Sequence, residues 1–236
     1  STGTRITKFT VNQTTSNRIL SINGVFANAK FRVDNNTFAT TSDIAVLMVV
    51  FKAWGLIDHC TFSGNSASEM IHNEAWGPSD ATGWTEDVTP GSVDALYVED
   101  CTFSKRILTD PFFTGTSALQ SYYGARTVVR HCTMNYCQID QHGTAGAIGA
   151  RWWEIYENTF TIPAGGGNQS SYMSIRAGSG VIFNNHKTGG PNAGAGFIGL
   201  TEEDTGYPAL YQIGRGKNQV LDPAYAWGND ASMPVG

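Results

Sequence analysis

Arginine, histidine and acidic side chains in the middle of this 236-residue chain could carry out two kinds of acid–base chemistry. Elimination from a uronic acid needs a cation to stabilise the enolate and a base to remove the neighbouring proton. For that reaction Arg126, Arg151 or Arg176 could supply the positive charge. The base would then be His142 or Tyr123.

Hydrolysis of a glycosidic bond instead needs two carboxyl groups that flank the bond. The sequence offers Glu74 and Asp140 as that pair, although elimination fits the available residues slightly better. Aromatic rings would complete either site, because a ring packs on the apolar face of a sugar while polar groups bind its hydroxyls. The residues predicted to bind substrate are Trp54, Trp84, Trp152, Arg126 and His72, and those predicted to act in catalysis are Arg151, His142, Asp140, Arg176, Tyr123 and Glu74.

Several of these candidates also have a purely structural alternative. Arg151 could cover the tryptophans that follow it with its aliphatic stem. His142 could be a polar turn residue, and Trp54 and Trp152 could pack along an edge of the fold. The sequence leaves these alternatives open.

Composition and motif content narrow the choice of function. The chain has a formal net charge of −5 and a pI near 5.5, which argues against nucleic acid as a partner because phosphate binding needs a basic face. Its longest apolar run, residues 44–51, is too short to cross a bilayer. Metalloprotease, P-loop, dinucleotide-binding and nucleophile-elbow motifs do not occur. Scarce charge and abundant Gly, Asn and Thr favour an all-β protein.

One short pattern recurs along the chain and predicts its architecture. Six segments align without gaps on a fixed point that is always Asn or Cys. Such a repeat predicts coils that stack on one another, so that equivalent residues lie about 4.8 Å apart and bury a core together. The segments are FRVDNNTF from Phe31, GLIDHCTF from Gly55, LYVEDCTF from Leu96, TVVRHCTM from Thr127, WEIYENTF from Trp153 and GVIFNNHK from Gly180.

The columns of the repeat indicate which residues face inward. Val or Ile stands three residues before the fixed point in every segment, and Phe or Met stands two residues after it, except at Lys187. The Thr between the fixed point and the Phe column would point outward. The fixed point itself predicts an inward ladder at a bend, where Asn amides hydrogen-bond from coil to coil. Its members are Asn36, Cys60, Cys101, Cys132, Asn158 and Asn185.

This combination of β-branched, Asn or Cys, and Phe columns resembles the pectin-lyase-like superfamily, whose bends carry Asn ladders. The resemblance covers residues 24–200 and implies an all-β, right-handed parallel β-helix, a single solenoid of about six to seven coils. That superfamily hosts lyases, hydrolases, isomerases and inert spikes, so the resemblance specifies an architecture and not a reaction. Residues 142–160 and 206–229 are also similar to uncharacterised β-helix repeat proteins of bacteria and phages.

In that superfamily the first strand of each coil lines the substrate groove. Alignment to the repeat gives residues 46–51, 70–76, 119–123, 147–151, 172–176 and 197–201 as first strands. The resemblance then implies that His72, Glu74, Tyr123, Arg151 and Arg176 lie in the groove, with Asp140 and His142 on a turn that leads into it, and Trp54, Arg126 and Trp152 along its margin. The insertion of residues 77–91, which contains Trp84, would follow the first strand of the third coil and form a binding loop.

We therefore expect a single domain with three parts. Residues 1–23 would be an N-terminal entry, residues 24–200 would hold the coils and the 77–91 insertion, and residues 201–236 would close the C-terminal end.

A column of acidic residues forms a second candidate site. Asp34, Asp58 and Glu99 share one position of the repeat, and Arg130 follows them. Stacked carboxylates repel one another unless a cation neutralises them, and calcium could bind there through hard oxygen ligands. We favour the alternative that they are solvated turn residues, and the sequence indicates no other metal or cofactor.

The cysteines follow the repeat. Because Cys60, Cys101 and Cys132 occupy the ladder position, we expect them to be stacked free thiols, and a disulfide between neighbouring coils is the alternative.

Three classes of function remain. The chain could cleave a polysaccharide, most plausibly an acidic one by a lyase reaction; it could bind a surface glycan without chemistry, as an adhesin or phage-fibre module; or it could be a structural solenoid that forms homo-oligomers or assembles end to end. Its composition suits an extracellular or secreted protein, on a virion or cell surface for example. A polysaccharide or surface glycan is the expected partner, with no nucleic acid and no membrane span.

Overall fold

The computed structural model of the chain describes residues 3–14, 18–25, 30–41, 46–64, 69–105, 117–143, 148–162, 171–189, 196–201 and 210–230. Its regular elements are short β-strands and two 3₁₀ helices, η1 (Ala81–Trp84) and η2 (Lys217–Gln219). The described part of the chain is therefore all-β, as predicted. Within it, no helix is long and apolar enough to span a membrane.

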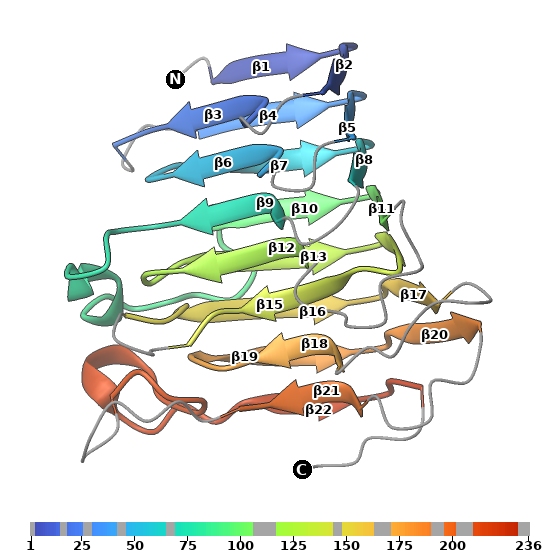
Figure 1. Cartoon of the computed structure of the whole chain (residues 1–236). Coiled ribbons are helices and arrows are strands. Elements are labelled where there is room, and N and C mark those ends of the chain that lie inside the picture. The colour runs from blue at the N-terminus through green and yellow to red at the C-terminus, as the bar shows by residue number, and fades with distance from the viewer. Residues whose placement is uncertain are drawn as a thin grey trace.

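The strands form three parallel sheets (Figure 1). The chain adds one strand to sheet A, then one to sheet B and one to sheet C, and we call each such set a coil. Sheet A contains β1 (Thr4–Thr7), β4 (Lys30–Asp34), β7 (Trp54–Asp58), β10 (Leu96–Glu99), β13 (Arg126–Arg130), β16 (Trp152–Tyr156), β19 (Ser179–Phe183) and β22 (Tyr225–Trp227). Sheet B contains β2 (Thr10–Gln13), β5 (Thr37–Thr40), β8 (Thr61–Gly64), β11 (Thr102–Lys105), β14 (Thr133–Asn135), β17 (Thr159–Ile162) and β20 (His186–Gly189). Sheet C contains β3 (Leu20–Asn23), β6 (Met48–Phe51), β9 (Glu69–Glu74), β12 (Ser117–Tyr122), β15 (Gln138–Gln141), β18 (Ser171–Ile175) and β21 (Gly196–Leu200).

The register of sheets A and B confirms the repeat. The first residues of the six aligned segments are paired from strand to strand in sheet A. Two residues after the fixed point, the Phe column pairs in the same way in sheet B, where the Phe62 ring stacks on Phe38 at 5.1 Å and on Phe103 at 4.9 Å. The repeat therefore predicted both which strands pair and in which register.

The predicted Asn and Cys ladder lies at the bend between sheets A and B. All six of its side chains are at most 2 % exposed. The residue before each of these six positions has a left-handed backbone, with φ of 50–55°, which turns the chain sharply so that the next side chain points inward. Asn158 shows how the coils are joined, because its amide accepts a hydrogen bond from the Cys132 N–H at 3.0 Å and donates one to the Val129 carbonyl at 2.9 Å.

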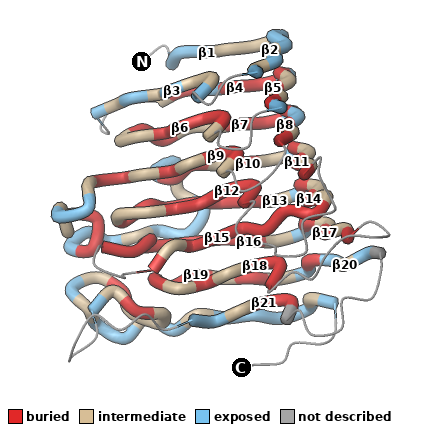
Figure 2. The backbone as a smooth tube through the Cα atoms, in the orientation of Figure 1, coloured by how far each residue is buried: buried red, intermediate tan, exposed pale blue. Residues whose placement is uncertain are grey.

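The core runs through the middle of the stack. Val or Ile from sheet A, Phe or Met from sheet B, and Met, Ile or Leu from sheet C form one continuous cluster of buried side chains. Figure 2 shows that the central coils are mostly buried and that the strands at both ends are more exposed. Each coil thus covers the apolar side of its neighbours, since one coil alone could not bury a core.

The predicted strands of sheet C are confirmed with one exception. Residues 148–151 are not a strand, and residue 147 lies outside the described residues. The strand of that coil is β15, whose Ile139 is buried and pairs with Leu119 and Met173 of its neighbours. Residues 148–151, which include Gly149, form the connection that leads to β16, whereas the inward Ile139 lies on the short strand β15.

The stack extends beyond the residues that the repeat covers at both ends. Strands β1–β3 add a coil before residue 24, and the exposed Phe9 takes the ladder position there, where its N–H donates to the Asn36 side chain at 2.8 Å. Strand β22 extends sheet A near the C-terminus, and Asn229 continues the ladder by accepting from the Asn185 N–H at 3.0 Å. Residues 77–91 lie between β9 and β10, as predicted.

The four cysteines are free and buried, which confirms the thiol assignment. Burial raises the pKa of Cys137 to about 12, and burial, followed by the neighbouring Cys132 thiol, raises the pKa of Cys101. Because the thiolate is the reactive form, we expect the native protein to resist an aromatic disulfide reagent and to release four thiols per chain after unfolding in guanidinium. Rapid labelling of any cysteine in the native protein would contradict this assignment.

Candidate functional site

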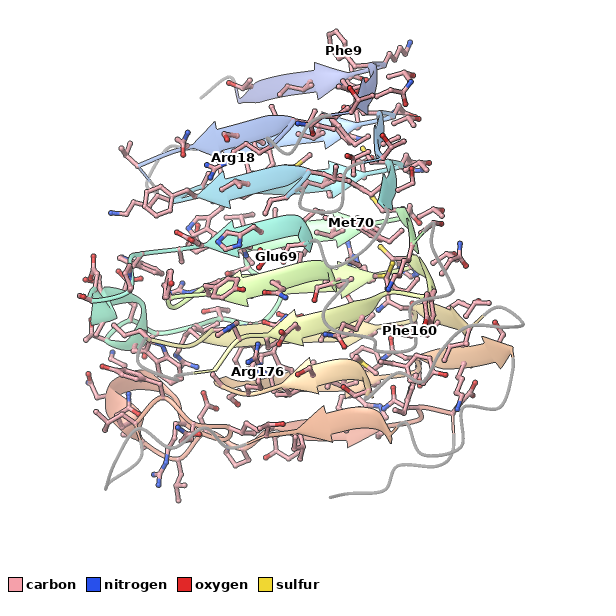
Figure 3. The ribbon with its side chains drawn as sticks, viewed as in Figure 1. Phe9, Arg18, Glu69, Met70, Phe160 and Arg176 are labelled. Atoms are coloured by element: carbon pink, nitrogen blue, oxygen red, sulfur yellow. The ribbon has the colours of Figure 1, made fainter. Side chains whose placement is uncertain are left out.

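The outward side of sheet C gathers most of the ionisable candidates. Ile71, Leu119 and Ile139 point into the core, so the alternation of a strand turns His72, Gln120 and Asp140 outward, and these three are paired in register. We call this surface the sheet C face, and Figure 3 shows it toward the viewer, with Glu69 and Arg176 labelled. It consists of Glu69, His72 and Glu74 of β9, Gln120 and Tyr122 of β12, Asp140 of β15, His142 that follows β15, and Arg176 that follows β18.

His72 is held between two carboxylates. Its Nδ1 contacts Glu69, and its Nε2 lies 2.5 Å from Glu74 Oε1. Burial alone would lower the pKa of His72, but the two glutamates together raise it to about 9. At neutral pH the imidazole is therefore a cation that donates to Glu69 and Glu74 and neutralises part of their charge.

Tyr122 connects the two histidines of the face. Its ring stacks on His72 at 4.5 Å and on His142 at 4.3 Å, and its hydroxyl donates to Glu69 at 2.8 Å and contacts the Gln120 side-chain oxygen. Burial, and then the nearby Glu69, raise the pKa of Tyr122 far above its usual range. The phenol is therefore neutral and serves as a hydrogen-bond donor and a packing surface.

Asp140 and Arg176 form a bidentate ion pair at the C-terminal side of the face. The Arg176 Nη2 lies 2.6 Å from Asp140 Oδ2, and its Nε lies 3.2 Å from Oδ1. Asp140 is only 4 % exposed. Burial raises the pKa of Asp140, and the charge of Arg176 acts in the opposite direction, as does that of His142.

A hollow of about 370 Å³ adjoins this face on the N-terminal side. His72 and Glu74 form one wall, Val46, Val49 and Phe51 form an apolar part, and Arg18 and Asn23 complete the lining. Pockets of this size with an apolar surface and a few polar groups are typical of small-ligand sites.

The predicted site residues fall into two groups. His72, Glu74, Asp140, His142 and Arg176 are together on the sheet C face. Tyr123 borders it, with its ring 5.6 Å from that of Tyr122, on a left-handed turn residue. The second group lies where the chain passes from sheet C to sheet A, at the start of β7, β13 and β16 and in η1. It consists of Trp54, Trp84, Arg126, Arg151 and Trp152, all of them buried.

The placement of the second group corrects two expectations. Arg151 does not lie on a strand of sheet C, because β15 takes that position, and its side chain packs instead over the Trp84 ring at 5.4 Å. Trp84 is only 1 % exposed and donates through its indole N–H to the Gly149 carbonyl at 3.1 Å. The described 77–91 loop is thus anchored by its tryptophan and does not present that ring to a ligand.

Sequence reasoning missed Glu69, Gln120 and Tyr122. Glu69 was missed because β9 begins one residue earlier than expected, at Glu69 itself. Tyr122 could have been found, because a strand with Leu119 inward turns Gln120 and Tyr122 outward.

The acidic column of sheet A is paired with arginines. Asp34, Asp58 and Glu99 stack in register, as predicted, but Asp34 is 0 % and Asp58 3 % exposed, so the solvated-turn interpretation is wrong. Bidentate bonds from Arg5 and Arg32 neutralise the two aspartates, and Arg130 lies 2.6 Å from Glu99. Among the described residues no cluster of His, Cys, Asp or Glu is arranged to hold a metal ion.

The His72 cluster predicts a pH dependence of stability. The pKa of His72 is about 9 in the folded chain, above the usual value of 6.5, so its stabilisation is fully present below pH 6.5 and is lost as the pH rises through 9. We expect the free energy of unfolding to fall over that range by roughly 1–3 kcal/mol. Denaturant titrations at several pH values would measure the slope. A wild-type slope that H72Q leaves unchanged would contradict the assignment.

Compared with models of protein families, with curated proteins and with solved structures, the chain shows no significant match. Its likeness to other proteins therefore identifies no function, and the geometry of the sheet C face is the basis for a proposal.

Proposed function

We propose that the chain folds as a right-handed parallel β-helix and binds an extracellular polysaccharide or surface glycan along the sheet C face. The observation that supports this best is the stack of Tyr122 between His72 and His142, next to carboxylates from two other strands. The outward edges of the three stacked rings, with hydrogen-bonding groups at fixed positions beside them, suit a sugar, whose ring faces are apolar and whose edges carry hydroxyls. The neighbouring hollow offers room for a further part of the same ligand.

If the bound glycan is cleaved, the geometry supports hydrolysis better than elimination. Elimination needs an available cation and a base, but Arg176 is paired with Asp140 and the His72 imidazolium already donates to two glutamates. A tyrosine base is disfavoured because burial raises the pKa values of both Tyr122 and Tyr123.

Hydrolysis needs one protonated carboxyl group and one carboxylate. Burial raises the pKa of Asp140, and the negative charge of Glu69 acts in the same direction, against the opposing charge of the paired Arg176. Glu69 contacts the His72 imidazole and accepts a hydrogen bond from the Tyr122 hydroxyl. These different environments assign Asp140 the role of acid and Glu69 that of base or nucleophile, so Glu69 takes the place that Glu74 has in the pair expected from the sequence.

A panel of neutral and uronic polysaccharides tests the proposal, with binding, new reducing ends and the absorbance of unsaturated products measured together. We expect binding to at least one polysaccharide, and any cleavage to release reducing ends without that absorbance. Y122A should abolish binding, whereas Y225A, which changes an exposed tyrosine on β22, should not. If the absorbance of unsaturated products appears and is the same after Asp140 is replaced, the reaction is an elimination. If no polysaccharide of the panel binds, the proposal is contradicted.

A further inference from the structure

Two buried arginines lie next to each other in the turns between sheets C and A. Arg126 begins β13, and Arg151 directly precedes β16, where its N–H donates to the Ala125 carbonyl at 2.9 Å. Their side chains are 7 % and 3 % exposed. They belong to neighbouring coils, beneath the 77–91 loop that crosses this edge of the stack (Figure 1).

Tryptophan rings pack against the flat faces of both guanidinium groups. Arg126 lies 5.8 Å from the ring of Trp54 and 5.8 Å from that of Trp76, and Arg151 lies 5.4 Å from that of Trp84. Indole rings stabilise the cation through their faces but offer no acceptor to its N–H groups. The N–H donors at the edges of the guanidinium groups still need oxygen partners.

The edges of Arg126 and Arg151 are used differently from those of three other arginines in this protein. Arg5, Arg32 and Arg176 each place Nε and Nη2 on the two oxygens of one aspartate. Arg126 and Arg151 do not, and the buried Nε of each has no hydrogen-bond partner among the described residues. A planar oxyanion that accepts from Nε and Nη together is the arrangement that an arginine favours.

The carboxylates that contact these two arginines are partly exposed to solvent, and each has a single contact with its arginine. Glu86 of the loop reaches Arg126 through one contact, at 2.8 Å, and its side chain is 49 % exposed. Asp222 lies 3.4 Å from Arg151 and is 36 % exposed. Burial lowers the pKa of Arg151, and the charge of Arg126 lowers it further, which means that the two cations repel each other.

We infer that Arg126 and Arg151 form a binding site for an oxyanion, a carboxylate, phosphate or sulfate group, with Glu86 as its internal competitor. The ligand group accepts from the Nε edge of Arg126 and displaces the exposed Glu86 carboxylate. Its charge also offsets the repulsion between the two arginines. This site is separate from the sheet C face and does not depend on the function proposed for it.

The loop that carries Glu86 has fixed points on both sides of that residue. Trp84 donates to the Gly149 carbonyl, and the Gly91 N–H donates to Glu154 at 2.9 Å. Glu86 can therefore be replaced without removing either anchor. Glu86 is therefore the most informative residue to replace.

Calorimetric titration of the whole chain with sodium phosphate, sodium sulfate, glucuronate and glucose tests the inference. We expect at least one of the three anions to bind and glucose not to bind at this site; the identity of the anion distinguishes a phosphate or sulfate ligand from a sugar acid. E86Q should bind that anion roughly ten-fold more tightly, because a competing charged hydrogen bond is removed. E157Q changes an exposed glutamate of similar exposure elsewhere on sheet A and should leave the affinity unchanged.

Two arginine variants complete the test. R126Q should abolish anion binding, and R126K, which keeps the charge but loses the bidentate edge, should weaken it strongly. Thermal unfolding of each variant shows whether it is folded. Anion binding that survives in folded R126K at wild-type affinity, an unchanged affinity in E86Q, or no anion binding at all would each overturn the inference.

Discussion

Replacing Asn158 by alanine should lower the free energy of unfolding by about 3–5 kcal/mol, because a buried network loses its central member. Asn158 is 0 % exposed. Its side chain accepts from the Cys132 N–H and donates to the Val129 carbonyl and to the Asn185 side chain. N158A would remove the side-chain partner of two backbone groups in the interior, the Cys132 N–H and the Val129 carbonyl. Denaturant unfolding followed by circular dichroism measures the loss.

The ladder itself provides a control for this prediction. Cysteine occupies the same position in three coils, where for example the Cys60 N–H donates to the Cys101 sulfur at 3.4 Å. N158C should therefore be clearly less destabilised than N158A. N135A, which removes a half-buried asparagine bonded to Ser104, should cost about 1 kcal/mol or less. Equal losses for N158A and N135A would contradict the role given to the ladder.

If the sheet C face hydrolyses its glycan, replacing Asp140 should have the second large effect, a loss of activity. D140N cannot donate the carboxyl proton, so kcat/KM should fall by about 100- to 10,000-fold, the range typical of a lost general acid. Binding of the glycan should be retained, because Tyr122 and His142 remain in place. Reducing-end assays and titration of the same variant separate the two effects.

Asp58 is a matched control for Asp140. Both aspartates are nearly fully buried, at 3 % and 4 % exposure, and both accept a bidentate bond from an arginine of a neighbouring coil. D58N and D140N should therefore lose similar amounts of stability, whereas only D140N should lose activity. Equal losses of activity in the two variants would show that Asp140 acts through the fold and has no role in the chemistry.

The repeat allowed most of the fold to be predicted from the sequence, because it fixes register directly. Each coil needs a β-branched residue, a ladder residue and a Phe in line with those of its neighbours, and these needs leave a visible pattern. The coils at the two ends of the stack do not show this pattern. Phe9 stands where the other coils have Asn or Cys, and Asn229 follows Asn185 by 44 residues, an interval longer than any within the recognised repeat.

The candidate site was only partly predictable. Sheet C strands carry one to three core residues each and vary in length, so their positions depend on turns that the sequence does not specify. Because residues 148–151 were expected to form a strand, Arg151 was assigned to the sheet C face, which its side chain does not reach. Strand β9 was expected to begin one residue too late, so Glu69 was overlooked. The alternation of Leu119 and Tyr122 on β12 was visible in the sequence and would have been the better guide.

The position of a bound oligosaccharide tests the central claim most directly. A crystal structure of D140N in complex with the tightest ligand of the polysaccharide panel would locate it. We predict a sugar ring packed across the outward edges of the stacked His72, Tyr122 and His142 rings, with its hydroxyls bonded to Glu69, Glu74 or Arg176, and the chain running along the stack across β9, β12 and β15. A ligand bound on sheet B, or at either end of the stack, with the sheet C face unoccupied would contradict the account.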